Sequence, residues 1–119
     1  MSAPWPRRLR FSKSKAALAL ELEDGRVLSI PYELLRVQSP SAEVQGHAPD
    51  QRKLVPGKAG VGVKAADPVG HYAVRIAFDD GHDTGLFTWD YLVGLGETAQ
   101  TQLEAYRAEL AAAGLNHIA

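Results

Sequence analysis

Apolar and polar positions alternate in two stretches of this chain, and each stretch leads into the same kind of turn. Residues 18–22 read Leu-Ala-Leu-Glu-Leu, and residues 74–78 read Val-Arg-Ile-Ala-Phe. An acidic residue and then Asp-Gly follow each stretch, at positions 23–25 and 79–81. Alternation of this kind is typical of a β-strand with one buried face, and Asp-Gly between two such strands is a strong signal for a β-hairpin. The two stretches therefore predict two hairpins.

A return strand and a short helix follow each predicted turn. We expect return strands at residues 27–30 and 83–87, and short helices at residues 32–37 and 89–92. Thr88 suits the N-cap of the second helix because its hydroxyl can accept a hydrogen bond from a free backbone N–H. The pattern thus predicts two β-hairpin–helix units with the same order of elements.

A longer helix is predicted over residues 97–113, and we expect Gly94 and Gly96 to separate it from the helix at 89–92. Its large apolar side chains recur at helical spacing. They are Leu103, Tyr106 and Leu110. Together these elements predict an α+β fold, with a small antiparallel or mixed sheet built from two β-hairpin–helix units and with a C-terminal helix.

The same alternation defines the expected core. We expect a strand over residues 72–78 with Tyr72 on its apolar face, a short strand at 61–63 and a turn at 67–70. The side chains expected in the core are Leu18, Leu20, Leu22, Ile30, Leu34, Val74, Ile76, Phe78, Phe87, Trp89, Leu92, Leu103, Tyr106 and Leu110.

Two segments lack such a pattern. Residues 1–13 are rich in arginine and proline, and we expect a basic flexible arm that either binds phosphate or acidic partners or is simply a frayed terminus. Residues 38–60 are expected to form a long loop, and long loops in compact domains often carry function. The expected division is an arm at 1–13, one domain at 14–114 and a tail at 115–119.

Composition narrows the functional classes. The chain has 119 residues, the size of one domain, and its formal net charge of -1 argues against a surface built for nucleic acid. It contains no cysteine, which excludes disulfides and cysteine-ligated zinc. No apolar run approaches the roughly 20 residues that cross a bilayer. The first ten residues lack the apolar core of a signal peptide, so we expect a cytoplasmic protein.

Candidate chemistry concentrates around His82. Asp79, Asp80 and Asp83 lie beside it in the sequence. An imidazole with carboxylates could hold a divalent cation. Alternatively, aspartates in a polar turn bond their own backbone. The local sequence favours the polar turn.

Two other side chains are candidates for binding. Trp89 is either an aromatic platform for a ligand or an anchor for the short helix that contains it. Arg36 could bind a carboxylate or a phosphate, pair with Glu33, or bond the last carbonyls of its helix. The sequence contains no phosphate-loop motif and no recognisable nucleophile–base pair.

Residues 72–92 form a long and distinctive string, Tyr-Ala-Val-Arg-Ile-Ala-Phe-Asp-Asp-Gly-His-Asp-Thr-Gly-Leu-Phe-Thr-Trp-Asp-Tyr-Leu. With Asp-Gly at 24–25, Ile-Pro at 30–31 and Leu-Leu-Arg at 34–36, it resembles the N-terminal domain family of gamma-butyrobetaine hydroxylase-like proteins. That family includes stand-alone bacterial members that are known as a domain of unknown function. The resemblance covers most of the chain and implies the α+β fold predicted above.

In the hydroxylases, this domain precedes an iron- and 2-oxoglutarate-dependent catalytic domain and carries a structural zinc. The resemblance places the zinc-binding histidine at His82 and the zinc-binding cysteines at Ser39, Ser41 and Val44. None of these three side chains is a thiolate, so the family's zinc site cannot form here. A chain of 119 residues leaves no room for the catalytic domain, and we therefore expect no enzyme activity.

The resemblance also implies that segment 39–47 lies beside His82. Glu43 and His47 then become candidate partners of His82, either around a weakly bound divalent metal, zinc or iron, or in a polar cluster. Other family members are fused to P-loop carriers of iron–sulfur clusters, which suggests an accessory role near iron or iron–sulfur enzymes.

Two functions therefore stay open. The first is a non-catalytic accessory or adaptor domain that binds a protein partner, and the alternative is a small metal-binding accessory protein that uses His82 with the 39–47 segment. A homodimer is a further expectation, because a short sheet with an open edge invites pairing.

Overall fold

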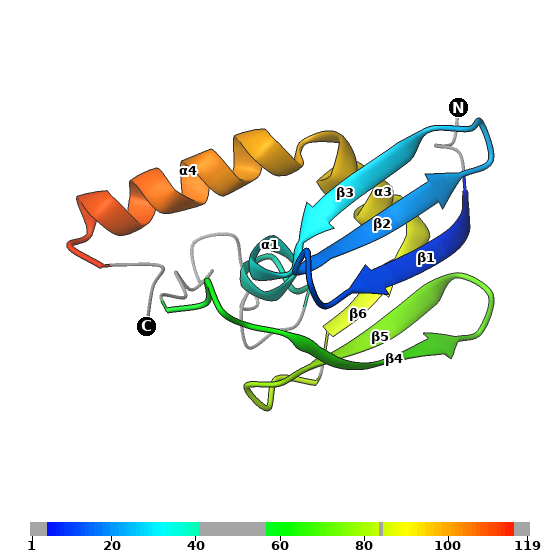
Figure 1. Ribbon diagram of the computed structural model, residues 1–119, viewed down its shortest axis with the longest axis horizontal. Coiled ribbons are helices and arrows are strands. Elements are labelled where there is room, and N and C mark those ends of the chain that lie inside the picture. Colours follow the sequence, from blue (N-terminus) through cyan, green and yellow to red (C-terminus); the bar gives the residue numbers. More distant parts are fainter. Residues whose placement is uncertain (1–4, 41–56, 84, 116–119) are drawn as a thin grey trace.

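The computed structural model describes residues 5–40, 57–83 and 85–115. Its strands form two three-stranded antiparallel sheets, each followed by a helix (Figure 1). The first unit contains β1 (Pro6–Ser12), β2 (Ala17–Leu22), β3 (Val27–Pro31) and α1 (Tyr32–Val37). The second contains β4 (Val63–Val69), β5 (Ala73–Phe78), β6 (Gly85–Thr88) and α3 (Trp89–Glu97), and α4 (Ala99–Ala112) follows it. The predicted α+β fold with a C-terminal helix is confirmed.

The alternating stretches form the central strands of the two sheets. In β2 every second side chain is buried, and the strand pairs Leu18 with Ile30 and Leu20 with Leu28 of β3. In β5 the same alternation buries Ile76 and its apolar neighbours. A strand with one apolar face is stable when that face is removed from water, so the pattern predicts both the strand and its orientation.

The two Asp-Gly turns have the same backbone. In the first turn (residues 22–26) the Leu22 N–H donates to the Arg26 carbonyl at 2.9 Å, and in the second turn (residues 78–82) the Phe78 N–H donates to the His82 carbonyl at 2.8 Å. The glycine of each turn has a φ of +93°, which other residues adopt only with strain. Gly25 and Gly81 therefore fulfil the same requirement at equivalent positions.

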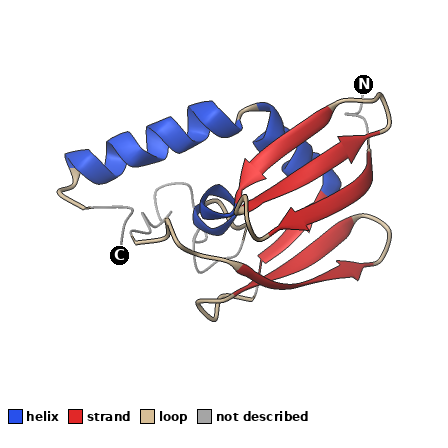
Figure 2. Cartoon of the chain, viewed as in Figure 1, coloured by secondary structure: helices blue, strands red, loops and turns tan. Residues whose placement is uncertain are grey.

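One hydrophobic core joins the two units. Side chains from both sheets and from α1, α3 and α4 belong to a single buried cluster. The helices pack alongside the strands, and α4 extends beyond them (Figure 2). Within the described ranges, no helix combines the length and the apolar character needed to cross a membrane.

The N-terminal segment is not a flexible arm over residues 6–12. It forms β1, which pairs antiparallel with β2 and places Arg10 opposite Ala19. Leu9 and Phe11 pack against the core while Arg10 is exposed and pairs with Glu21 at 2.7 Å. The prediction was wrong because the arginines concealed this alternation of apolar residues.

The predicted turn at 67–70 was also wrong, because residues 67–69 belong to β4 and only Gly70 lies in the turn. Pro68 is tolerated there because β4 is an edge strand, where a missing backbone N–H need not break the ladder. The strand predicted at 61–63 begins only at Val63. Tyr72 precedes β5 and is 54% exposed, so it does not share the apolar face of that strand.

Gly94 and Gly96 do not end the second short helix, since α3 runs through both to Glu97. A Cβ atom at position 96 would lie 2.8 Å from the Cβ of Leu28, so the glycine allows α3 to approach β3 closely. Packing against the sheet thus offsets the low helix propensity of glycine. Most predicted core residues are buried, but Trp89 and Leu103 are only partly buried.

Candidate functional site

A polar cluster is built on the second turn. The Asp80 Oδ1 atom accepts a hydrogen bond from the backbone N–H of His82 at 3.1 Å, which is the bond that an aspartate at the start of a turn commonly makes. This is the contact expected of a polar turn whose aspartates bond their own backbone, and Asp80 makes it. It also leaves the second carboxylate oxygen of Asp80 available to other elements.

The Oδ2 atom of Asp80 binds two cations from different parts of the chain. Arg36, in the last turn of α1, donates from Nε at 2.8 Å, and Lys58, which precedes β4, donates from Nζ at 2.6 Å. The side chains of Arg36 and Asp80 are 12% and 19% exposed, so water screens this ion pair only in part. Asp80 therefore links the second turn to α1 and to the approach to β4.

These contacts change the acidity of Asp80. Burial raises the pKa of its carboxyl group, but the hydrogen bonds from Lys58, from the His82 backbone and from Arg36 together outweigh it and lower the pKa to about 2. Asp80 is thus an anion at neutral pH. A carboxylate with so low a pKa is a poor general base.

His82 lies under the turn and faces the end of the first unit. Its Nε2 atom is 2.9 Å from the Oγ atom of Ser39, and both residues are buried. The ring also packs against Phe78, with 6.0 Å between ring centroids. A Cβ atom at Gly85 would lie 2.4 Å from Ser39 Oγ, so only glycine leaves room for the serine at this position.

A second contact holds the chain next to Ser39. The hydroxyl of Tyr91, in α3, donates a hydrogen bond to the backbone carbonyl of Gln38. Ser39 precedes segment 41–56 and Lys58 follows it, and both contact the second turn. The second turn therefore binds the chain both before and after this segment.

The Ser39–His82 contact has the distance of a nucleophile–base pair but not its surroundings. Ser39 is 0% exposed and is covered by Gly85, so a substrate carbonyl has no path to its hydroxyl. The Asp80 carboxylate bonds the backbone N–H of His82, whereas a catalytic aspartate would orient the ring. The arrangement holds elements together, and it lacks the accessibility that acyl transfer requires.

The expected proximity of the 39–47 segment and His82 is confirmed at Ser39. The other family positions, Ser41 and Val44, and the candidate ligands Glu43 and His47 lie outside the described residues. Across the described ranges, no group of three or more His, Cys, Asp or Glu side chains could hold a metal ion. A serine hydroxyl and one imidazole do not replace the thiolates of a structural zinc site, so the residues here do not fit the family's zinc.

The structure brings together some predicted site residues and separates others. Arg36, Asp80 and His82 form the cluster, whereas Asp83 is exposed beside it. Trp89 lies at the other end of β5, where its indole Nε1–H donates to the His71 carbonyl at 2.8 Å. Lys58 was missed, because a lone lysine in a glycine-rich segment gives no signal of a partner that is distant in the sequence.

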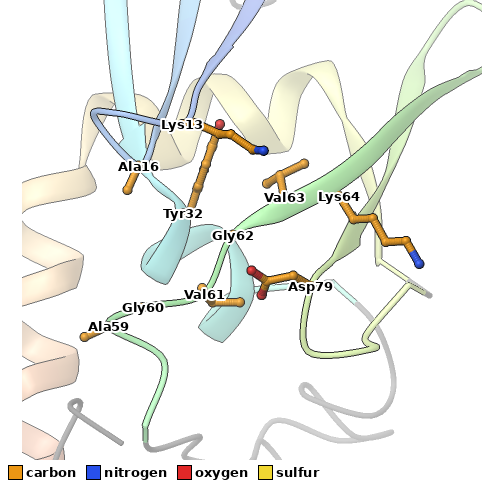
Figure 3. A pocket seen from close by; sticks show the side chains of 10 residues that line it. All are labelled: Lys13, Ala16, Tyr32, Ala59, Gly60, Val61, Gly62, Val63, Lys64 and Asp79. Carbon is orange, nitrogen blue, oxygen red and sulfur yellow. The ribbon is translucent and has the colours of Figure 1, made fainter.

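Asp79 lies in a different environment from Asp80. Its backbone N–H donates to the Gly62 carbonyl at 2.9 Å, and its side chain lines an open pocket of about 450 Å³. Figure 3 shows Lys13 and Tyr32 on one side of this pocket and Asp79 on the other, while Lys64 points away. A cation and an anion on facing walls do not select a ligand of one charge.

The comparisons with known proteins agree with this fold. The sequence matches the family described as gamma-butyrobetaine hydroxylase-like, N-terminal, over residues 9–93. Two proteins solved by NMR in solution are similar over 96% of this chain: one is 43% identical with a TM-score of 0.81 over 90% of its own length, the other 40% identical with a TM-score of 0.82 over 85%. No curated protein matches the chain.

A crystal structure from Acidithiobacillus ferrooxidans is also similar. It is described as a protein of unknown function of the DUF971 family, is 37% identical, and has a TM-score of 0.67 over 80% of this chain and 98% of its own length. The family match spans most of the chain, and the solved relatives share its fold. The protein is therefore a member of the gamma-butyrobetaine hydroxylase-like N-terminal domain family.

Proposed function

We propose that this chain is a non-catalytic accessory domain that acts by binding a protein partner through the second turn and the residues that adjoin it. The observation that carries the proposal is the closed polar cluster. Both oxygens of Asp80 accept hydrogen bonds from groups of the same chain, and the His82 ring contacts the buried Ser39 hydroxyl. These contacts hold the turn in one shape, and they leave neither Asp80 nor His82 available to react with a substrate.

The exposed part of the turn supports a role in recognition. Asp79, Gly81 and Asp83 are exposed around the buried His82. A turn whose backbone is held by several long-range contacts loses little conformational entropy on binding, and this favours affinity. The family resemblance suggests the class of partner, an iron or iron–sulfur enzyme, and the proposed compartment is the cytoplasm.

The test of this proposal is site-specific photo-crosslinking in cells. A photoreactive amino acid at Asp83 reports on the turn, and the same residue at Ala108, an exposed position on α4, is the matched control. We expect one discrete protein adduct from position 83 that is absent from position 108. Equal adducts at both positions, or none at either, would contradict the proposed surface.

The absence of catalysis needs a separate test. A fluorophosphonate probe labels accessible serine nucleophiles that are activated by a base. We expect no labelling of the native protein, because Ser39 is buried under Gly85. Labelling of the native protein that disappears in Ser39→Ala would identify the Ser39–His82 pair as a working dyad and would overturn the proposal.

The alternative function is a metal-binding accessory protein. The observation that favours it is the contact between Ser39 and His82, since it brings the start of segment 39–47 to the imidazole. Titration of metal-free protein with Zn²⁺ and, without oxygen, with Fe²⁺ tests it by residue-resolved NMR. Stoichiometric binding that is lost in both His82→Ala and His47→Ala would establish this function, and unchanged spectra of His82 and His47 would remove it.

A further inference from the structure

A second, smaller pocket lies at the other end of β5 from the polar cluster. It has a volume of about 200 Å³ and is lined by Trp5, Tyr72, Thr88, Trp89 and Asp90. Trp5 comes just before β1, Tyr72 lies in the turn that leads into β5, and the other three residues lie where β6 meets α3. Three distant segments therefore build this pocket, and neither proposed function uses it.

Two of its walls are aromatic side chains that a folded chain would ordinarily cover. Trp5 is 46% exposed and Tyr72 is 54% exposed. They are the aromatic members of the set of large exposed apolar side chains in the described ranges, and both line this one pocket. Exposed aromatic groups that gather at one concave place are typical of a binding surface.

The aromatic residues are held in place by hydrogen bonds. The backbone N–H of Trp5 donates to Glu23 Oε1, and the backbone N–H of Glu23 donates to the Trp5 carbonyl, both at 3.0 Å. The backbone N–H of Trp89 donates to the Tyr72 carbonyl at 3.1 Å, and its indole N–H donates to the His71 carbonyl at 2.8 Å. Because the indole N–H is engaged, Trp89 offers its ring surface as a wall and has no donor left for a ligand.

The charge of the pocket comes from Asp90. The Thr88 hydroxyl caps α3 by accepting from the Tyr91 N–H at 3.2 Å. Asp90 is exposed, and within the described ranges no side chain makes an ion pair or hydrogen bond with its carboxylate. Among the residues that line this pocket, Asp90 is the charged one, and it lies beside aromatic faces whose electron density also attracts cations.

We infer that this pocket binds a single cationic side chain, an arginine or a lysine, presented by a protein partner. Aromatic faces with a carboxylate match a guanidinium or an ammonium group and repel an anion. A volume of about 200 Å³ is enough for one side chain. The inference goes beyond the proposed function, because it assigns a second recognition site at the opposite end of β5.

NMR titration with short peptides tests this inference. The ligand is the blocked tripeptide Gly-Arg-Gly, and its control carries citrulline, which has the shape of arginine without the charge. We expect saturable shifts at the indole N–H signals of Trp5 and Trp89 and at Tyr72 with the arginine peptide. The citrulline peptide should bind about 3- to 30-fold more weakly. Equal affinity for both peptides, or no shifts, would overturn the inference.

Matched variants separate the contributions of the walls. Tyr72→Ala and Asp90→Asn should each weaken binding of the arginine peptide about 3- to 10-fold, whereas Val27→Ala, at another exposed apolar side chain, should leave it unchanged. If Asp90→Asn lowers stability but not affinity, Asp90 serves only the start of α3 and the ionic part of the inference fails. Binding of tetramethylammonium without the peptide would mean a free small cation and would overturn the assignment to a protein side chain.

Discussion

The first turn and the second turn have the same backbone and opposite surroundings. In each turn, the last strand residue donates to the carbonyl four residues later, and a glycine with a φ of +93° stands between them. In each turn, the aspartate also accepts a hydrogen bond from the N–H two residues on, at 3.0 Å for Asp24 and 3.1 Å for Asp80. The local sequence Asp-Gly therefore specifies one structure twice.

The side chains around that structure differ. At the first turn, Arg26 is exposed and binds Asp24 at 2.8 Å and Glu97 at 3.2 Å. At the equivalent position of the second turn, His82 is buried against Ser39. The first turn is thus a solvated hairpin end, and the second is a junction of several elements. The comparison teaches that local sequence sets the backbone of a turn, whereas elements distant in sequence set its chemistry.

The largest effect is expected from the core that both units share. Ile76 in β5 and Leu20 in β2 are equivalent and are both 0% exposed. Ile76→Ala and Leu20→Ala should each lower the free energy of unfolding by about 2–5 kcal/mol. Urea unfolding followed by tryptophan fluorescence and by circular dichroism measures both losses. If the two probes gave separate transitions in either variant, the units would fold independently and the single core would be disproved.

A smaller loss of stability should distinguish the second turn from the first. Ser39→Ala removes the hydroxyl that contacts the buried His82 Nε2 and should cost about 1–3 kcal/mol, because this hydrogen bond is buried. Arg26→Ala removes only exposed ion pairs and should cost less than about 1 kcal/mol. Denaturant midpoints of the two variants provide the measurement. Equal losses would mean that burial does not distinguish the two turns.

Much of this fold follows from the sequence, and two of the failures, β1 and the continuation of α3, involve contacts with distant segments. The alternation in β2 and β5, the Asp-Gly turns and the apolar stripe of α4 are local patterns, and local patterns predict local structure. β1 and the continuation of α3 through Gly96 depend on packing against β2 and Leu28, which lie elsewhere in the chain. Tertiary contacts decided these elements against their local propensity.

The site was predictable only in part, for the same reason. His82, Asp80 and Arg36 were named as candidates because an imidazole, carboxylates and a guanidinium carry chemistry. Their association depends on a contact that spans 44 positions between Arg36 and Asp80. Lys58, which is closer to Asp80 than Arg36 is, stands in a segment without periodicity, so no pattern pointed to it. Chemistry can be proposed from residue types, but partners require the fold.

Lowering the pH should remove the stabilisation that the Asp80 carboxylate provides at the second turn. Because the folded pKa of Asp80 is about 2 and its ordinary value is 3.8, the ionised carboxylate stabilises the fold above pH 4, and this stabilisation is lost as the pH falls from 4 through 2. Asp80→Asn should lower stability at pH 7 by about 1–2 kcal/mol, after allowance for solvent screening, and should have little effect near pH 2.

Urea unfolding at pH 7, 4 and 2 provides the measurement, and Asp24→Asn is the control. The pKa of Asp24 is lowered first by the Arg26 backbone N–H and then by the Arg26 side chain, but the Asp24 side chain is exposed to solvent. The pH-dependent loss should therefore be smaller than for Asp80→Asn. A loss in Asp80→Asn that stays constant from pH 7 to pH 2 would show that ionisation of Asp80 does not stabilise the fold.

The smallest effect concerns the backbone that the turns share. Gly25 and Gly81 have the same φ, and no atom lies within 4 Å of a Cβ added at either position. Gly25→Ala and Gly81→Ala should each cost about 1 kcal/mol, because both place an L-residue in the same strained conformation. Thermal and urea unfolding should give the same loss for the two variants. A clearly larger loss for Gly81→Ala would mean that the contacts of Asp80 and His82 constrain the second turn beyond its own sequence, and the shared backbone would then be a consequence of those contacts. Equal losses would establish that the backbone is set locally in both turns and that the long-range contacts only add chemistry to it.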